Sequence, residues 1–444
     1  MAGAASRLDL NDPTRDAACT RGARIPSAIR CRPRGRAGRR AQRAAGARGA
    51  QGAAPARLTA GLTLRKPTMD FAFSEEQEML RRSARDFLAK ECPPKVVRKL
   101  MEGSDAYDPA LWSKIAGLGW TALGIPEQYG GVGSFLDLIV VLEEAGRALM
   151  PGPFFATMGL AVPALIEAGT EAHKKTVLSA IASGDARATL AFTEPSARWD
   201  ASGVALTAAP AGGGWKLDGV KLFVPDAGSA DYMVVAARTR GEGEDGISLF
   251  LVEGKPKGTS VHQLQTLDMT RRWSEVRFEG VELSADSLMG PPHKAWPALK
   301  RALEWGTAAL CSEMIGGAQK VLETSTDYAK TRHQFGKPIG IYQAVSHKLA
   351  DMLVLSESGR SATYYAAWAV DADAPDRSLA SSMAKAYVSD AYRKVAGDGI
   401  QVHGGIGFTW EHDMHLYFKR AKASEVTLGD ATYHRELVAQ ALDL

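Results

Sequence analysis

Helical spacing of apolar residues characterises the chain from Ser74 to about residue 185. Ser74, followed three residues later by Gln77, is typical of a capping box at a helix start. After it, one helical face repeats the apolar positions Leu80, Ala84, Phe87 and Leu88. Further helices are predicted at 109–118, 134–148, 157–168 and 171–183, separated by Gly and Pro breaks. Residues 69–185 are therefore expected to form an all-α first domain.

From Ala188 the period of the apolar residues changes to that of strands. Val276 and Phe278 alternate with polar residues, which turns one face of their strand inward. Short strand-like runs are predicted at 189–192, 203–207, 215–217, 220–224, 232–237, 247–252 and 273–281. Several short strands at this spacing indicate a β-sandwich or barrel. Residues 186–292 are therefore expected to form a middle β domain.

The last third of the chain returns to helical spacing, with stripes such as Leu310, Met314, Ala318 and Val321. Helices are predicted at roughly 295–331, 340–371, 376–404 and 414–442. This pattern fits an antiparallel four-helix bundle over residues 293–444. The predicted fold class is multi-domain α+β, with an N-terminal all-α domain, a middle β domain and a C-terminal bundle.

The first 68 residues differ from this body in composition. They hold 14 arginines and one lysine against three aspartates, a net charge of +12, and no Phe, Trp or Tyr. Such a segment cannot bury enough apolar area to offset the entropy of ordering, so a disordered basic extension is expected. Three origins are open: a misplaced start ahead of Met69, an Arg-rich transit peptide, or a non-specific nucleic-acid-binding arm around Arg36–Arg43.

The rest of the composition is that of an ordinary globular protein, with 45% hydrophobic and 23% charged residues. No run of about 18 or more apolar residues occurs, so no transmembrane helix is expected. The four cysteines are Cys19, Cys31, Cys92 and Cys311. Because none of them forms a C-x-x-C pair, they predict neither a zinc site nor a disulfide framework. This usage fits a reducing compartment, and we expect a cytoplasmic protein.

One stretch, Tyr328–Met352, combines a basic residue, an aromatic residue, glycine and proline within a helical pattern. By its pattern alone it is a helix ending near Thr331, a turn through 336–338, and a second helix. In that interpretation the positive charge of Arg332 interacts favourably with the helix dipole at the C-terminus, and Phe335 fills a core.

The same stretch, YAKTRHQFGKPIGIYQAVSHKLADM, resembles the R-x-Q-F-G-x-P-I…Q…H-x-L-A-D-M signature of the acyl-CoA dehydrogenase family. A second segment, QVHGGIGFT at 401–409, is similar to the Q-x-x-G-G-x-G-[FY] segment of that family. The resemblance covers roughly residues 69–444. The predicted order of α, β and α domains is also that of the acyl-CoA dehydrogenase fold.

The resemblance implies an FAD cofactor shared between subunits. It assigns Arg332 and Phe335 of one subunit, and Gln401, Gly404 and Gly405 of its neighbour, to the adenosine diphosphate half of FAD. Arginine offers a fork of donors for the pyrophosphate, and glycines let the backbone approach it. A shared cofactor implies at least a dimer, and the usual assembly of the family is a dimer of dimers.

Two middle-domain segments resemble those that hold the flavin in this family. In AFTEPSARWD, Thr193 matches the position whose backbone and hydroxyl meet the flavin. Arg198 and Trp199 depart from the pattern, since a small residue and a serine are usual there. In GVKLFVPDA, Phe223 is expected to stack on the isoalloxazine. Pro225 replaces a hydroxyl residue that contacts flavin N5, and proline has no donor.

The catalytic base is missing from both places where the family keeps it. Desaturation of an acyl thioester requires a carboxylate for the α-proton, while the β-hydrogen leaves as hydride to the flavin. The glutamate of the usual Y-E-G segment corresponds to Leu428, and that of relatives with a base on the first bundle helix corresponds to Gly306. Two nearby carboxylates are candidates. Asp430 is expected to cap the following helix, and Glu304 lies about 200° around its helix from Gly306.

Two functions therefore remain open from the sequence. In the first, the chain is an acyl-CoA dehydrogenase that uses an unusual carboxylate. In the second, it is a non-catalytic partner that shares FAD with a glutamate-bearing chain in a heteromeric dehydrogenase. A different flavoenzyme of the same fold is a third, weaker class. The resemblance implies an acyl-CoA substrate and an electron-transferring flavoprotein as acceptor, and nucleic acid is not an expected partner.

Overall fold

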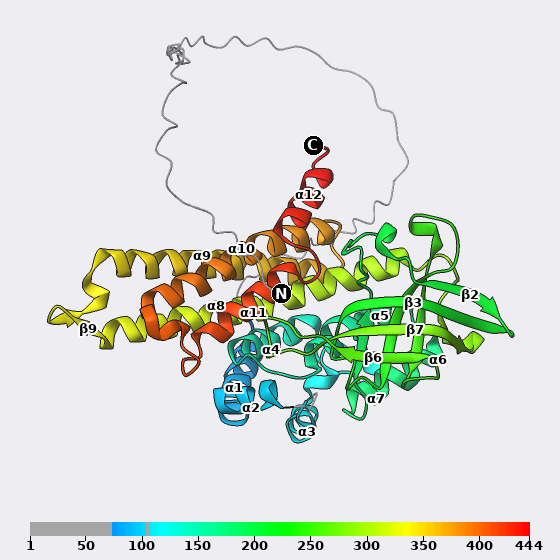
Figure 1. The fold of residues 1–444 in the computed structure, drawn as a ribbon, viewed down its shortest axis with the longest axis horizontal. Helices are drawn as coiled ribbons and strands as arrows, with labels where there is room; N and C mark the ends of the chain where they lie inside the picture. Colours follow the sequence, from blue (N-terminus) through cyan, green and yellow to red (C-terminus); the bar gives the residue numbers. More distant parts are fainter. Residues whose placement is uncertain (1–72, 104–106) are drawn as a thin grey trace, which may run out of the picture. The chain divides into compact units, whose positions relative to one another are not determined.

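The computed structural model describes residues 73–103 and 107–444, so the predicted basic extension at 1–68 lies outside the described residues. Three regions follow one another along this part of the chain. N-terminal helices lead into a β-sheet, and the sheet leads into long C-terminal helices (Figure 1). This arrangement confirms the predicted fold class.

The N-terminal region is helical, as expected. Its main helices are α1 (Glu75–Glu91), α2 (Pro94–Glu102), α3 (Pro109–Gly117) and α4 (Phe135–Arg147). The capping box at Ser74 is present, because its hydroxyl accepts from the Gln77 amide at 3.2 Å and its own amide donates to the Gln77 side chain at 3.1 Å. Helix α4 is buried along most of its length, and the bundle packs on it through a hydrogen bond from the Ser312 hydroxyl to the Ile139 carbonyl.

Two expected helices of this region are less regular than their apolar pattern predicts. The first begins as a π-helix, η3 (Phe155–Ala161), and continues as α5 (Val162–Ala168). The second is divided into α6 (Glu171–His173), the π-turn η4 (Lys174–Leu178) and α7 (Ser179–Ala182). Two short 3-10 turns, η1 (Trp120–Ala122) and η2 (Glu127–Tyr129), lie in the preceding loop. π-Helical turns are rare and recur at functional sites, and η3 indeed borders the cavity described below.

The middle region is an eight-stranded sheet in which seven strands follow the order β6-β7-β3-β2-β4-β5-β8 and β1 pairs with β4. Its strands are β1 (Ala188–Ala191), β2 (Thr207–Ala211), β3 (Gly214–Pro225), β4 (Tyr232–Arg238), β5 (Ile247–Glu253), β6 (Thr259–Gln263), β7 (Trp273–Leu283) and β8 (Leu288–Met289). The predicted strands 215–217 and 220–224 are one strand, β3. The strand predicted at 203–207 starts only at Thr207, because a 3-10 turn, η5 (Ala201–Gly203), precedes it.

The sheet curls around its own apolar core. Val276 and Phe278 of β7 face inward, as predicted, and share a buried cluster with Val235 of β4 and Phe250 of β5. Alternate residues of β4, such as Val234, point the other way into the core formed with the helices. Because successive side chains of a strand point to opposite faces, one face of β4 packs into the core of the sheet and the other into the core shared with the helices.

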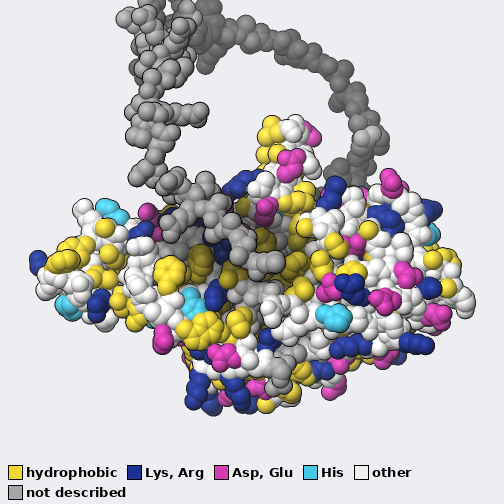
Figure 2. Space-filling view, viewed as in Figure 1, with side chains coloured by type: hydrophobic (Ala, Val, Ile, Leu, Met, Phe, Trp, Pro, Cys, Tyr) yellow, Lys and Arg dark blue, Asp and Glu magenta, His cyan; other side chains and the backbone are white. Residues whose placement is uncertain are grey.

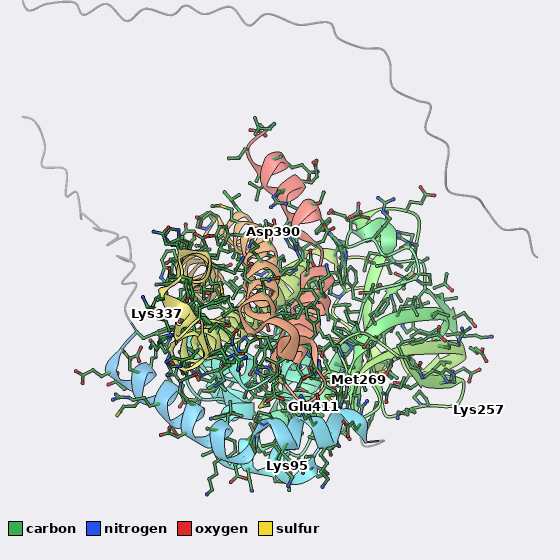
Figure 3. The ribbon with its side chains drawn as sticks, turned by 60° about the vertical axis from the view of Figure 1, so that its left-hand side comes forward. Lys95, Lys257, Met269, Lys337, Asp390 and Glu411 are labelled. Atoms are coloured by element: carbon green, nitrogen blue, oxygen red, sulfur yellow. The ribbon has the colours of Figure 1, made fainter. Side chains whose placement is uncertain are left out.

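The C-terminal region is built on three long helices, α8 (Trp296–Thr331), α9 (Gln343–Asp371) and α10 (Arg377–His403). Between α8 and α9 the chain forms a small hairpin of β9 (His333–Gln334) and β10 (Lys337–Pro338), followed by η8 (Ile339–Ile341). Lys337, the first residue after the tip of this hairpin, lies on the opposite side of the molecule from Lys257 of the β region (Figure 3).

The fourth predicted helix, 414–442, is wrong as a single element. It is broken into α11 (Met414–Val426) and α12 (Ala431–Ala441). Leu428 and Gly429 between them have φ angles of 60° and 95°, a left-handed conformation that ends α11. Asp430 then caps α12 by accepting from the Tyr433 amide at 2.8 Å. Three residues of the turn 427–430, namely Thr427, Leu428 and Asp430, line the cavity described below.

The described helices and the charges on one face of the molecule bear on the expected partners. None of the helices in the described ranges combines the length and apolar character that crossing a membrane requires. On the face shown in Figure 2, Lys and Arg side chains are interspersed with Asp and Glu. Such mixing gives no single-sign patch of the kind that attracts phosphate backbones.

Candidate active site

A cavity of about 730 Å³ lies where the β region meets the bundle and η3. Leu160 of η3, Leu303 of α8 and Leu428 contribute apolar walls from the helices. The β region contributes Thr193 and Phe223. Two residues predicted to hold the flavin therefore meet the usual base position at one cavity.

A bulge in β3 directs Phe223 to this cavity. The pairing of β3 with β7 shifts register between Lys221 and Val224, and Phe223 itself has a left-handed φ of 50°. Bulges commonly redirect a side chain beside a functional site. Half of the Phe223 side chain stays exposed, so its ring is open to a flat ligand at the cavity. The carbonyl of Thr193 accepts from the Leu222 amide at 2.8 Å, which fixes the two segments together.

The residues that depart from the family pattern also line the cavity. Arg198 and Trp199 lie on its wall, and Pro225 does so next to the bulge. Trp199 packs against Phe192 at 6.1 Å between ring centroids, and its carbonyl accepts from the Tyr433 hydroxyl at 3.2 Å. Trp199 is thus built into the wall by contacts on both sides.

Gly306 and Leu428, the two positions that the resemblance assigns to the base, lie close together. A Cβ added at Gly306 would lie 3.4 Å from Leu428 Cδ1, 2.6 Å from Leu160 Cδ2 and 3.0 Å from the Gly159 carbonyl. Gly306 therefore lies directly behind the part of the cavity wall that Leu160 and Leu428 form, although it comes from α8 and Leu428 comes from the turn after α11. Both are apolar, so this part of the wall carries no group that could accept a proton.

The two candidate carboxylates are differently placed. Asp430 lines the cavity, but its carboxylate caps α12. Glu304 does not line the cavity and pairs instead with Arg377 of α10 at 2.7 Å between Oε2 and Nε. The side chain of Ser378 also donates to Glu304. Glu304 is therefore a contact between α8 and α10, as its angular offset from Gly306 predicts.

The other carboxylates on the cavity wall are also engaged. Asp268 accepts from Arg420 Nε at 2.7 Å and from the Thr270 amide at 2.9 Å. Asp200 accepts from the Ser202 amide at 2.9 Å and from its neighbour Arg198 at 3.1 Å. Asp200 is held by donors of its own loop, and Asp268 by one donor of its own loop and by Arg420 of α11, so the donors keep both carboxylates in place.

The other predicted cofactor residues lie at the far end of the bundle. Phe335 is 92% exposed at the hairpin tip, so it does not fill a core. Arg332 ends α8, as predicted. Gln401 and Gly404 lie at the end of α10, and Gly405 follows in η9 (Gly404–Phe408).

The ends of α8 and α10 lie together in one chain. The ring of Tyr328, one turn before the end of α8, stacks on that of His403 at 4.5 Å. The sequence assigned the two segments to different subunits. In the structure, one chain presents both of them at the same end of its bundle (Figure 1), and neither segment contributes to the lining of its cavity.

A buried ion pair, which the sequence did not predict, joins the two segments that were expected to hold the flavin. Lys221 Nζ donates to Glu194 Oε1 at 2.6 Å and to the Phe192 carbonyl at 3.2 Å, and the lysine side chain is fully buried. Glu194 also accepts from the backbone amides of Ala205 and Leu206 at 2.8 and 3.0 Å. Both residues stand inside the quoted motifs, but 27 positions of sequence separate them. Only the folded sheet shows that they pair.

A second missed residue, Asp226, is buried directly after Pro225. Within the described part of the chain, neither of its carboxylate oxygens has a hydrogen-bond partner. Burial raises its pKa to about 7, while the charges of Arg271 and Arg420 oppose the rise. The carboxyl group is therefore neutral in mildly acidic solution and becomes costly to keep buried once it ionises.

We predict that Asp226→Asn stabilises the protein above neutral pH. The folded-state pKa of about 7 lies above the unfolded value of about 3.9, so the native aspartate binds the extra proton and its contribution to stability falls as pH rises between these values. The stability advantage of the variant should therefore be larger at pH 8 than at pH 5, by roughly 2–3 kcal/mol. Urea unfolding at both pH values measures this, and an equal difference at both would contradict it.

The sequence matches three family models in chain order. They are the N-terminal domain of acyl-CoA dehydrogenases over residues 74–185, the middle domain over 189–281 and the C-terminal domain over 294–442. The acyl-CoA dehydrogenase IpdE2 of Mycolicibacterium smegmatis is 33% identical over 358 residues, which cover 80% of this chain and 95% of that protein.

Solved structures agree with the sequence matches. Butyryl-CoA dehydrogenase from Megasphaera elsdenii superimposes with a TM-score of 0.79 at 28% identity, over 85% of this chain and all of that one. A chain of the ChsE4–ChsE5 complex from Mycobacterium tuberculosis does so with a TM-score of 0.77 at 27% identity, over 84% and 99%. With the fold, the cavity and the matched domains all in agreement, the chain belongs to the acyl-CoA dehydrogenase family.

Proposed function

We propose that this chain is the base-lacking half of a two-chain acyl-CoA dehydrogenase, in which a homologous partner supplies the catalytic glutamate. As a family member the chain is an acyl-CoA dehydrogenase flavoprotein, an oxidoreductase that acts on CH–CH bonds. The observation that carries the proposal is Leu428, an apolar side chain on the cavity wall next to Gly306, at the two positions that the family resemblance assigns to the base. This chain has a carboxylate at neither position.

The described residues fit an FAD cofactor in two separate parts. The cavity beside Phe223 suits a flat ring system, because its lining is largely apolar. The bundle end offers the Arg332 guanidinium and the open backbone of Gly404 and Gly405 to an anionic group. When bound, FAD takes up the β-hydrogen of the acyl group as hydride. The distance between the two parts within one chain supports a site shared by two chains.

The partner reading also explains which parts of the motif are retained. Arg332, Phe335, Gln401 and both glycines keep the family pattern at the bundle end, where a chain serves its neighbour. Pro225 and Leu428 break the pattern at the cavity, where a chain serves itself. The similar solved chain from Mycobacterium tuberculosis belongs to a complex of ChsE4 with ChsE5, which supports an assembly of two different chains here. We further propose that an electron-transferring flavoprotein accepts the electrons.

A homomeric enzyme with Asp430 as base is the second candidate, because Asp430 is the carboxylate nearest along the chain to position 428 and lines the cavity. To act, it would have to release the amide that it caps at 2.8 Å. Asp430→Asn keeps the cap acceptor and removes the base. If the chain alone oxidises an acyl-CoA and this variant does not, the second candidate replaces the first.

We predict that Arg332→Ala weakens FAD binding in the assembled protein by about tenfold, because a charge-assisted hydrogen bond is worth about 1.5–3 kcal/mol. Lys330→Ala is the matched control, since Lys330 is an exposed cation two residues earlier that pairs only loosely with Asp327 at 3.9 Å. Flavin released on dilution, followed by its fluorescence, measures both. Equal retention of FAD in the two variants would remove Arg332 from the site.

A further inference from the structure

A buried ammonium group lies beneath the turn that carries position 428. Lys385 of α10 has no exposed side-chain surface. Its Nζ donates to the Gly429 carbonyl at 2.7 Å, to the Glu425 carbonyl at 3.0 Å and to the Ser389 hydroxyl at 3.0 Å. All three donors of the ammonium group are thus used, and two of them hold the backbone on either side of Leu428.

The acceptors explain why a charge is tolerated there. The Glu425 carbonyl lies in the last turn of α11, at the end where the helix dipole is negative. A buried cation favours this position because unpaired carbonyls point toward it. The side chain therefore ties α10 to the end of α11 and to the start of α12 in one contact.

A second side chain holds the same turn from the other side. His434 Nε2 lies 2.8 Å from the Leu428 carbonyl, so this nitrogen carries the proton and donates. Burial, with the nearby Lys385 charge, lowers the pKa of His434 to about 4, which keeps the imidazole neutral. Gly429 has no room for a side chain, because an added Cβ would lie 2.4 Å from the Tyr433 ring.

The turn is strained and needs such support. Leu428 has a φ of 60°, which is costly for a residue with a branched side chain. This conformation points residue 428 at the cavity wall, next to Gly306. The chain thus keeps the contacts of Lys385 and His434 that hold the turn, although residue 428 is a leucine and not a base.

We propose that Lys385 is a positioning residue that locks the turn 427–430 in the left-handed conformation that presents residue 428 to the cavity. His434 assists it through the Leu428 carbonyl. This inference rests on the proposed function, because it gives the turn the task of shaping the cavity wall at the vacant base position. It adds that the turn remains competent to hold a carboxylate in place.

Hydrogen exchange on the full-length protein tests the proposal without any cofactor. In Lys385→Met, the amides of residues 428–433 should exchange at least about tenfold faster than in the parent protein. Lys385→Gln, which keeps an amide donor but no charge, should fall between the two. Lys394→Met is the matched control on the same helix, since Lys394 is largely exposed, and it should leave the turn unchanged.

The pattern of exchange separates positioning from general stability. Faster exchange confined to 428–433 supports the proposal. Unchanged protection of the turn, or equal acceleration throughout α8, α9 and α10, overturns it. If Lys385→Met does not fold, the Gln variant gives the same comparison.

A second readout joins the turn to the chemistry. In a Leu428→Glu background, Lys385→Gln should slow flavin reduction by acyl-CoA at least about tenfold at equal flavin content, because the introduced carboxylate is no longer held. An unchanged rate would overturn the positioning role. A third outcome separates the two proposals. If Leu428→Glu does not support flavin reduction, but hydrogen exchange shows that Lys385→Gln loosens the turn, the result counts against the proposed function alone.

Discussion

Leu428→Glu is expected to give the flavin-loaded chain the ability to be reduced by an acyl-CoA, with a gain of at least about 100-fold over the parent protein. A positioned general base contributes roughly 10²–10⁴-fold to proton transfer. The turn that carries residue 428 is already fixed by Lys385 and His434, so the new carboxylate needs no further support. Anaerobic mixing with a panel of acyl-CoAs, followed by flavin absorbance, measures the gain.

Two controls make this result specific. The glutamine of Leu428→Gln has nearly the same shape as the glutamate but cannot act as a base, so this variant should show no gain in flavin reduction. Gly306→Glu places a carboxylate at the other vacant position, where even a Cβ would lie 2.6 Å from Leu160 and 3.0 Å from a backbone carbonyl. It should be destabilised by about 1–3 kcal/mol rather than activated. Equal rates for the glutamate and glutamine variants at 428 would contradict the proposal that this position lacks the base.

Glu194→Ala is expected to lower the free energy of unfolding by about 3–5 kcal/mol, because it leaves the Lys221 ammonium buried without its counter-charge. The lysine side chain is fully buried and pairs with Glu194 at 2.6 Å. The two segments that face the cavity should loosen together, so flavin affinity should fall as well. Urea unfolding, with flavin release as a second probe, measures both effects.

Lys221→Met in the Glu194→Ala background should recover much of this loss, because it removes the stranded charge. Recovery should be incomplete, since Glu194 also accepts from two backbone amides. Glu275→Ala is the surface control. Its pair with Arg277 is partly exposed, so its loss should cost less than about 1 kcal/mol. A Glu194→Ala cost as small as this control would show that the buried pair is not needed.

Local signals in the sequence predicted local structure well. The capping box at Ser74, the end of α8 at Thr331 and the inward face of β7 are each determined by residues within a few positions of one another. Asp430 was expected to cap a helix, and it does. That cap implied a helix start at Ala431, but the left-handed φ of Leu428 was not expected, because nothing in a leucine indicates a turn that Lys385 holds from another helix.

Contacts between distant segments account for most of the remainder. Lys221 and Glu194 are 27 residues apart, and no pattern in either motif marks them as partners. Strand β6 was missed because it lies at the edge of the sheet and its residues are not fully buried. Gly306 and Leu428 were each matched to a base position by motif, but only the fold shows that they share one wall. The assignments of Arg332, Phe335, Gln401, Gly404 and Gly405 to FAD stay predictions.

The most direct test compares the purified full-length chain alone with the same chain mixed with a homologue that carries Y-E-G at the position of Leu428. Both samples are titrated anaerobically with a panel of acyl-CoAs while flavin content and absorbance are recorded. The proposed function predicts no bleaching by any acyl-CoA for the chain alone, and bleaching of a stable two-chain complex. Rapid bleaching of the chain alone would contradict it, and Asp430→Asn would then identify the base.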